Sequence, residues 1–417
     1  MESTKKQLSL EVLPWLVVHS DGTLERLAGT EVCPPGLDPE TGVLSKDIII
    51  DPKTDLSARI YRPDSIQPGQ KLPVVLYFHG GAFLISSASL PNYHTSINKL
   101  VAQANIIAVS VNYRLAPEHP LPTAYEDSWN ALQGVQAGNE PWINDYADFN
   151  QFFLAGDSAG ANISHHLAFR AKQSDHTVKI KGIGMIHPYF WGTQPVGSEV
   201  TDEARKQMWR FVCPSDKGSD DPWINPFADG SPNLEGLECE RVIITVAERD
   251  ILRERGKMYY EKLVNSNWRG NVEIMETKGK DHVFHIFEPN CDEAKEMFVK
   301  LFRDLISTAL ASRIDPVCVR VDTGRGTTFG FVKLFRDLIS TALASRIDPV
   351  CVRVDTGRGT TFGVLEISTW FIHLSAAINQ RSEKVSLKTK RRTGVKGSRN
   401  INHFRSIDFR IFLLLVI

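Results

Sequence analysis

Two kinds of hydrophobic pattern follow one another along the chain. Alternating stretches come first, at 46–50 and 56–61, separated by Asp51-Pro52. Alternation is typical of strands with one buried face, so we predict an antiparallel hairpin at a sheet edge. From residue 74 onward the apolar runs are continuous, which indicates strands that are buried on both faces. These continuous runs lie at 74–78, 106–111, 152–155, 183–186 and 242–246, and a last strand is expected at 272–276.

Helix-length amphipathic stretches separate the continuous runs. Strands that alternate with helices in this way predict right-handed crossovers and a mainly parallel sheet flanked by helices. We therefore predict an α/β domain over residues 1–312, closed by a helix from about Cys291 to Leu310. Residues 1–44 and about 190–235 are rich in apolar and aromatic side chains, and we expect them to form a helical lid over the strand ends.

The last part of the chain repeats itself. Residues 298–330 recur without a change as residues 331–363. Stacked repeats need three or more units, so two identical copies do not indicate a solenoid. We interpret residues 313–417 as an atypical extension that is poorly ordered, and we expect its second copy of the closing helix to be redundant.

Charge is unevenly distributed between this extension and the rest. Residues 331–417 hold 15 Lys and Arg against 6 Asp and Glu, which leaves 33 against 43, or −10, for residues 1–330. A basic segment suggests a nucleic-acid or membrane role. However, its aromatic residues are few, and the terminal IFLLLVI is too short to span a bilayer. We therefore expect neither nucleic acid nor a membrane as a partner.

The overall composition, 42% hydrophobic and 23% charged, is ordinary for a soluble globular protein. The 6 cysteines show no C-x-x-C spacing, which favours reduced thiols over disulfides or a metal site. The apolar N-terminal stretch is interrupted by Glu11 and Pro14, so we do not interpret it as a signal peptide. We expect a cytoplasmic protein that needs no metal and no organic cofactor.

Residues 151–162 carry the first candidate for chemistry. The apolar run 152–155 breaks into Gly156-Asp157-Ser158-Ala159-Gly160 and then becomes helical in pattern. A serine at the tip of a sharp strand-to-helix turn needs small residues two positions before and after it, because side chains there would collide. Gly156 and Gly160 meet that need, so we predict that Ser158 is a nucleophile.

A serine hydroxyl needs a base to take its proton and a carboxylate to orient that base. In hydrolases built on a parallel sheet the chain order is serine, acid, histidine, each after a strand. Asp250 follows the run RVIITVAE and His282 follows VEIMET, so we predict them as acid and base. The rivals are Asp157, which we expect to point away from the pocket, with Glu248 for the acid and His187 or His285 for the base.

A hydrolase also has to stabilise the negative charge that develops on the substrate oxygen, usually with backbone N–H groups. His79-Gly80-Gly81-Ala82-Phe83 stands in the first strand-to-helix loop, where glycines let the backbone approach a substrate closely. We predict an oxyanion hole formed by Gly80, Gly81 and Ala159, the last being the residue after the nucleophile.

Together, these motifs give the chain a family resemblance. HGGAF, YRLAPEHPLPTAYED (113–127), GDSAG, AERD and DHVFH resemble the plant carboxylesterases of the hormone-sensitive-lipase-like branch of α/β-hydrolases, over about residues 8–312. The resemblance implies the triad Ser158, Asp250 and His282 and the same oxyanion hole, with the N-terminal segment in the lid. It also implies a serine carboxylesterase that hydrolyses esters of small, fairly apolar metabolites through an acyl-enzyme.

Two alternatives on the same fold stay open. The gibberellin receptors resemble this family but have lost the triad histidine, and the presence of His282 argues against a receptor. The hydroxyisoflavanone dehydratases also resemble it, and there the same base would abstract a proton instead of activating a serine. The oligomeric state and the natural substrate are not predicted.

Overall fold

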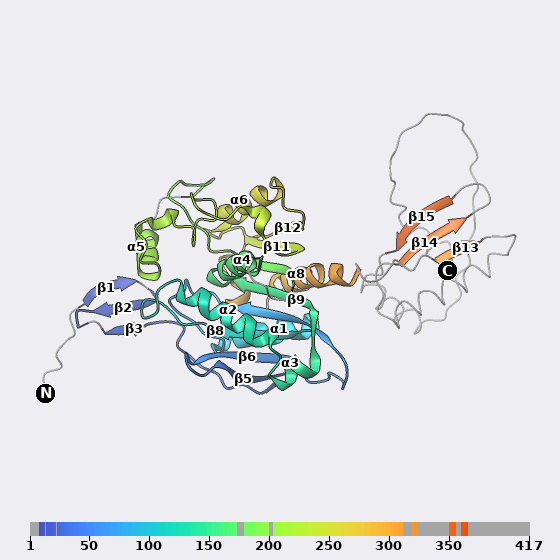
Figure 1. Cartoon of the computed structure of the whole chain (residues 1–417), viewed down its shortest axis with the longest axis horizontal. Coiled ribbons are helices and arrows are strands. Elements are labelled where there is room, and N and C mark those ends of the chain that lie inside the picture. Colours follow the sequence, from blue (N-terminus) through green and yellow to red (C-terminus); the bar gives the residue numbers. More distant parts are fainter. Residues whose placement is uncertain are drawn as a thin grey trace, which may run out of the picture. The chain divides into compact units, whose positions relative to one another are not determined.

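The computed structural model describes residues 8–12, 14–21, 23–172, 179–199, 203–311, 319–322, 350–355 and 360–365. The chain divides into two compact units, Met1–Asp315 and Pro316–Ile417. Figure 1 shows the helices and strands of both units. The predicted end of the first domain, after residue 312, falls among residues outside the described ones.

Nine of the described strands of the first unit form one sheet, in the order β12-β11-β10-β9-β7-β8-β6-β5-β4. The strands β12 to β8 of this order pair in parallel, whereas β6, β5 and β4 pair antiparallel at one edge. The predicted α/β class with a mainly parallel sheet is therefore confirmed. The strands are β4 (Leu37–Asp38), β5 (Val43–Asp51), β6 (Leu56–Pro63), β7 (Leu72–Phe78), β8 (Ile107–Asn112), β9 (Ala147–Asp157), β10 (Ile180–Ile186), β11 (Arg241–Ala247) and β12 (Asn271–Thr277).

Burial along the strands follows the two hydrophobic patterns. The continuous runs of β7 and β9 are buried on both faces, from Val74 to Phe78 and from Phe152 to Ala155. The alternating segment β5 keeps polar residues half-buried or exposed, and it pairs antiparallel with β6, as predicted for an edge hairpin. A sheet with this pattern needs helices on both faces of its parallel part.

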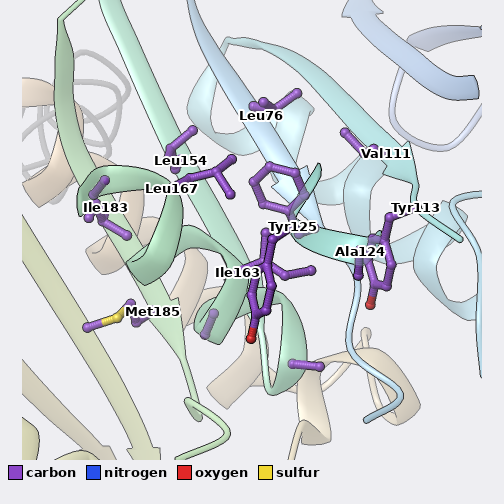
Figure 2. Packing of buried hydrophobic residues seen from close by; sticks show 14 of the residues in the cluster. Leu76, Val111, Tyr113, Ala124, Tyr125, Leu154, Ile163, Leu167, Ile183 and Met185 are labelled. Atoms are coloured by element: carbon purple, nitrogen blue, oxygen red, sulfur yellow. The ribbon is translucent and has the colours of Figure 1, made fainter. Parts of the chain in front are cut away.

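Two hydrophobic clusters fill the space between the sheet and its helices. Leu76 and Leu154 face one cluster together with side chains from α2, α4 and α6, as Figure 2 shows for Ile163, Leu167 and Tyr125. The neighbouring strand residues face the other cluster, with α1 and α8. The helices are α1 (Pro91–Ala104), α2 (Thr123–Gln136), α3 (Pro141–Tyr146), α4 (Ala159–Lys172), α5 (Glu203–Val212), α6 (Arg253–Val264), α7 (Phe284–Phe287) and α8 (Asp292–Ala311).

The N-terminal segment differs from the prediction of a helical lid. Its described part forms an antiparallel sheet of β1 (Leu8–Val12), β2 (Leu16–His19) and β3 (Leu24–Arg26). Val17 and Val18 are β-branched and favour a strand, and Asp21 closes the turn by accepting a hydrogen bond from the Thr23 N–H at 2.9 Å. Local strand and turn preferences therefore outweigh the apolar character on which the helix prediction rested.

The segment between β10 and β11 is also less helical than predicted. It contains α5 and two short 3-10 turns, η1 (Gly218–Asp220) and η2 (Leu234–Gly236), and the rest is irregular. Polar anchors hold it down: Asn162 of α4 donates to the carbonyl oxygens of Tyr189 at 3.1 Å and Trp223 at 2.7 Å. No helix in the described part of the chain has the length and apolar character needed to cross a membrane.

The second unit contains a three-stranded sheet of β13 (Val319–Asp322), β14 (Val350–Asp355) and β15 (Thr360–Leu365). Strands β13 and β14 come from the two copies of the repeat and pair in parallel, Val319 opposite Val352 and Asp322 opposite Asp355. The sequence analysis did not predict these strands. The second copy of the closing helix lies outside the described residues, so its redundancy stays a prediction.

Candidate active site

Ser158 occupies a sharp turn between β9 and α4. Its φ of +52° lies in the left-handed region, which few residues other than glycine adopt. The flanking chain is so close that a Cβ on Gly160 would lie 1.8 Å from the carbonyl oxygen of Phe78. A Cβ on Gly156 would lie 2.4 Å from the carbonyl carbon of Gly160. Steric crowding therefore explains both glycines of the motif, and it holds the serine at the tip of the turn.

The predicted acid and base meet at the same edge of the sheet. Asp250 follows β11 and His282 follows β12, and the carboxyl ends of parallel strands share one edge. The Nδ1 atom of His282 lies 2.8 Å from Oδ2 of Asp250. A second hydrogen bond, from the Leu252 N–H to Oδ1 at 2.8 Å, fixes the carboxylate. Because Nδ1 carries the proton that Asp250 accepts, Nε2 of His282 is left as a proton acceptor.

Electrostatics favour the ionised carboxylate at this position. The side chain of Asp250 is fully buried, whereas that of His282 is 31% exposed. Burial raises the pKa of the Asp250 carboxyl, but the charge interaction and hydrogen bond with His282 outweigh burial and hold it below the usual value. Asp250 therefore stays negative at neutral pH, where it can stabilise a protonated His282 ring.

Ser158 and His282 line the same cavity. The Ser158 side chain makes no hydrogen bond to any described residue, His282 included, so its hydroxyl is available to a molecule in the cavity. Hydrogen bonds between nucleophile and base are often absent until a substrate is bound. The structure thus brings serine, histidine and aspartate to one site, with the histidine–aspartate pair already formed.

His187 takes a different position from the one expected of a base. Its Nδ1 accepts a hydrogen bond from the Val283 N–H at 2.8 Å and lies 3.8 Å from Oδ2 of Asp250. Burial lowers the pKa of His187 well below its usual value, so the ring is neutral. Val283 has a φ of +46°, which is strained for a β-branched residue. His187 therefore holds the strained backbone directly after His282.

The other rivals lie outside the cavity lining. His285 is fully buried, and burial lowers its pKa to about 3. Glu248 is exposed and accepts a hydrogen bond from the Gly279 N–H at 2.7 Å. Neither residue contributes to the cavity in which Ser158 lies. Asp250 and His282 are therefore the acid and base that the described structure brings to the serine.

The glycine loop corrects one of the predicted oxyanion donors. The N–H of Gly80 is already donated to Oη of Tyr93 at 2.7 Å, and Gly80 does not line the cavity. The next two residues, Gly81 and Ala82, do line it. Gly80 was a wrong choice because two adjacent glycines look alike in sequence, whereas a partner for the amide from α1 distinguishes them.

Three other amides remain candidates for the oxyanion hole. The N–H groups of Gly81, Ala82 and Ala159 have no hydrogen-bond acceptor among the described residues. Gly81 has a φ of +104° and Ala82 a φ of +53°, so both stand in a tight turn. Ala159 is the first residue of α4, where the N–H groups of a helix have no partner within the helix. Sequence reasoning missed Ala82 because it has no glycine signal.

Asp157 lies under this loop. It borders the cavity, contrary to expectation, but its oxygens accept hydrogen bonds from the phenols of Tyr77 at 2.9 Å and Tyr93 at 2.7 Å. Burial raises its pKa to about 6, even though both phenols lower it. Asp157 is thus tied to two tyrosines and has no hydrogen bond to a described histidine, which does not suit the acid of a triad.

The cavity has a volume of about 980 Å³ and is mainly apolar. The N-terminal segment contributes Trp15 and Leu27, and α5 contributes Met208 and Phe211. Apart from tyrosines, the titratable residues in its lining are Glu31, Asp157 and His282, and no Lys or Arg is among them. A cavity of this size can hold a ligand as large as a typical drug molecule.

Known proteins resemble the chain throughout the first unit. A family model described as alpha/beta hydrolase fold matches residues 75–286. A protein of Arabidopsis thaliana named probable carboxylesterase 2 is 82% identical over 301 residues, which is 71% of this chain and 96% of that protein. Tuliposide A-converting enzyme 1, a chloroplastic protein of Tulipa gesneriana, is 43% identical over 305 residues, covering 71% of this chain and 77% of its own.

Solved structures resemble it as well. A hyperthermophilic esterase from the archaeon Pyrobaculum calidifontis matches with a TM-score of 0.54 and 28% identity, over 64% of this chain and 86% of its own. A thermostable carboxylesterase from a metagenomic library matches with a TM-score of 0.55 and 26% identity, over 66% of this chain and 90% of its own.

The raised pKa of Asp157 predicts an unusual pH dependence of stability. Because the folded state binds the proton more tightly than the unfolded state, the free energy of unfolding falls as the pH rises from about 4 to 6. The ionised carboxyl then lowers the free energy of unfolding by about 2–3 kcal/mol at neutral pH. Asp157→Asn should remove this dependence. Urea unfolding at several pH values measures it, and a difference between variant and wild type that does not change with pH would contradict the assignment.

Proposed function

The chain belongs to the alpha/beta hydrolase fold family, and from this premise we propose that it is a serine carboxylesterase that works through an acyl-enzyme. Its similarity to plant carboxylesterases and to solved esterases makes it a carboxylic ester hydrolase. The observation that carries the serine mechanism is the 2.8 Å hydrogen bond between His282 and the buried Asp250, in the cavity that Ser158 lines.

In the first half-reaction Ser158 attacks the ester carbonyl carbon. Nε2 of His282 takes the proton of the hydroxyl as the new C–O bond forms. Asp250 stabilises the resulting imidazolium through the hydrogen bond to Nδ1. The proton then passes from His282 to the leaving alkoxide as the old ester bond breaks, and an alcohol departs. The acyl group stays on the serine oxygen.

In the second half-reaction water replaces the alcohol. His282 takes a proton from a water molecule while the water oxygen attacks the acyl carbonyl carbon. The bond to the Ser158 oxygen breaks, and His282 returns the proton to that oxygen. The products are a carboxylic acid and the free enzyme, so no metal ion and no organic cofactor is required.

Both half-reactions pass through a tetrahedral intermediate with a negative oxygen. We assign the N–H groups of Gly81, Ala82 and Ala159 to this oxygen, because they have no acceptor among the described residues and stand beside Ser158 or in the cavity lining. Removing one such donor from a serine hydrolase slows the reaction by roughly a hundredfold to a thousandfold. The hole is therefore an essential part of the proposed mechanism.

The cavity lining supports neutral, fairly apolar esters as substrates. Its titratable groups besides tyrosines are Glu31, Asp157 and His282, so an anionic substrate would find no cationic side chain of Lys or Arg there. The side chains from the N-terminal segment and α5 enclose the apolar part of such an ester. A cytoplasmic location stays a prediction, since the similar tulip enzyme is named as chloroplastic.

Labelling with a fluorophosphonate probe tests the nucleophile. We expect the wild type to be labelled and Ser158→Ala and His282→Ala to lose both the label and, by at least about a thousandfold, the hydrolysis of p-nitrophenyl esters. Ser86→Ala is the matched control, because Ser86 is the other serine in the cavity lining and should not be the labelled residue. An inert wild type, or a label that survives in Ser158→Ala, would contradict the proposal.

The His187–Val283 contact makes a separate prediction about rate. His187→Leu removes the acceptor for the Val283 N–H, so the loop behind His282 loosens and kcat should fall roughly tenfold to a hundredfold. His187→Asn has nearly the shape of leucine but keeps an oxygen close to the position of Nδ1, and it should retain most of the wild-type kcat. Equal losses in the two variants would show that ring volume, and not this hydrogen bond, is what matters.

A further inference from the structure

The loop that follows β7 is strained at the residues that face the cavity. Gly81, Ala82 and Phe83 have consecutive φ values of +104°, +53° and +65°. A residue other than glycine in this region costs about 1–3 kcal/mol, so two of them persist only where the surroundings hold the backbone. The same residues supply two of the proposed oxyanion donors. What holds this loop therefore decides where those donors point.

Several contacts fix the carbonyl groups of the loop. Oη of Tyr113 donates to the carbonyl oxygen of His79 at 2.6 Å, and its ring stacks on the His79 ring with centroids 4.3 Å apart. The N–H of Leu84 donates to the carbonyl oxygen of Gly81 at 2.9 Å, which closes the turn. These contacts hold the loop at both ends, but none of them reaches an N–H group between residues 79 and 83.

Tyr93 makes the contact that these residues lack. Its Oη accepts a hydrogen bond from the Gly80 N–H at 2.7 Å and donates its own proton to Oδ2 of Asp157, also at 2.7 Å. Because the phenol proton is committed to Asp157, the lone pairs of the oxygen face Gly80. Tyr93 is 3% exposed and Asp157 is fully buried, so little water competes for either bond.

Asp157 connects this contact to the nucleophile. It directly precedes Ser158, and Tyr77 holds its other oxygen at 2.9 Å. The packing is so close that a Cβ on Gly80 would lie 2.4 Å from Oδ2 of Asp157 and 3.0 Å from Oη of Tyr93. Gly80 is therefore required for space next to the Asp157–Tyr93 pair, which explains the first glycine of the loop without an oxyanion role.

We propose that Tyr93 is a positioning residue that aligns the oxyanion hole with the nucleophile, by holding the Gly80 amide against a carboxylate that is covalently next to Ser158. This inference rests on the proposed ester hydrolysis. The path runs from Ser158 through Asp157 and Tyr93 to Gly80, and then along the backbone to the Gly81 and Ala82 amides. Through this path the attacking oxygen and the donors for the developing charge share one rigid frame.

Two tyrosine variants separate this role from general packing. Tyr93→Phe removes the oxygen that joins Gly80 to Asp157, whereas Tyr77→Phe removes the other phenol on Asp157 and leaves the Gly80 contact in place. We expect Tyr93→Phe to lower kcat for a p-nitrophenyl ester about tenfold to a hundredfold with little change in KM, because the donors act on the transition state. Tyr77→Phe should retain a kcat close to that of the wild type.

Inhibitor binding supplies a readout that packing alone would not change. A trifluoromethyl ketone forms a tetrahedral adduct with an active serine and places its oxygen in the hole, so its affinity should fall in Tyr93→Phe by about the same factor as kcat. A planar amide of the same shape, which binds without forming the adduct, should keep its affinity. Thermal unfolding of each variant shows whether it is folded.

The outcomes distinguish this proposal from the proposed function. An inactive wild type that reacts with no fluorophosphonate would overturn the serine mechanism itself. An active wild type in which Tyr93→Phe and Tyr77→Phe lose the same rate, or in which Tyr93→Phe changes only KM, would overturn the role of Tyr93. Should Tyr93→Phe fail to fold, Asp157→Asn tests the same path: its one carbonyl oxygen serves two phenols, so kcat should fall while KM is kept, and an unchanged kcat would count against the proposal.

Discussion

The hydrogen bond between His282 and the buried Asp250 is the interaction on which the site depends. Asp250 is fully enclosed, and an ionised carboxylate is stable there only because His282 and the Leu252 N–H provide hydrogen bonds to it. The same bond sets the tautomer of the histidine and leaves Nε2 as the acceptor for a proton. Both residues are in place because β11 and β12 are parallel neighbours that end at one edge of the sheet.

Side-chain contacts then fix the backbone on each side of this pair. Behind His282, the ring of His187 accepts the N–H of the strained Val283. On the opposite side of the nucleophile, Tyr93 accepts the N–H of Gly80 beside the strained loop. Strained backbone of this kind tends to gather at functional sites, where surrounding contacts maintain it. The sheet supplies the positions of the loops, and these two contacts supply their exact conformations.

The sequence predicted the features that depend on local chemistry. Buried strands gave continuous apolar runs, and Gly156 and Gly160 marked the turn at Ser158 because crowding there excludes side chains. The oxyanion loop was only partly predictable, since the engagement of Gly80 depends on Tyr93, which is 13 residues away on another element. The N-terminal strands were mistaken for helix because a short apolar stretch fits either structure until its pairing partners are known.

The central claim is that Ser158, His282 and Asp250 act as one unit, and a double-variant comparison of kcat tests it most directly. The measurement compares Ser158→Ala, His282→Ala and the combined variant on one p-nitrophenyl ester. Residues that perform a single step together lose that step when either is removed, so the combined variant should be no slower than the slower single variant. Losses that multiply in the combined variant would contradict the account, because they would mean that the two side chains contribute independently.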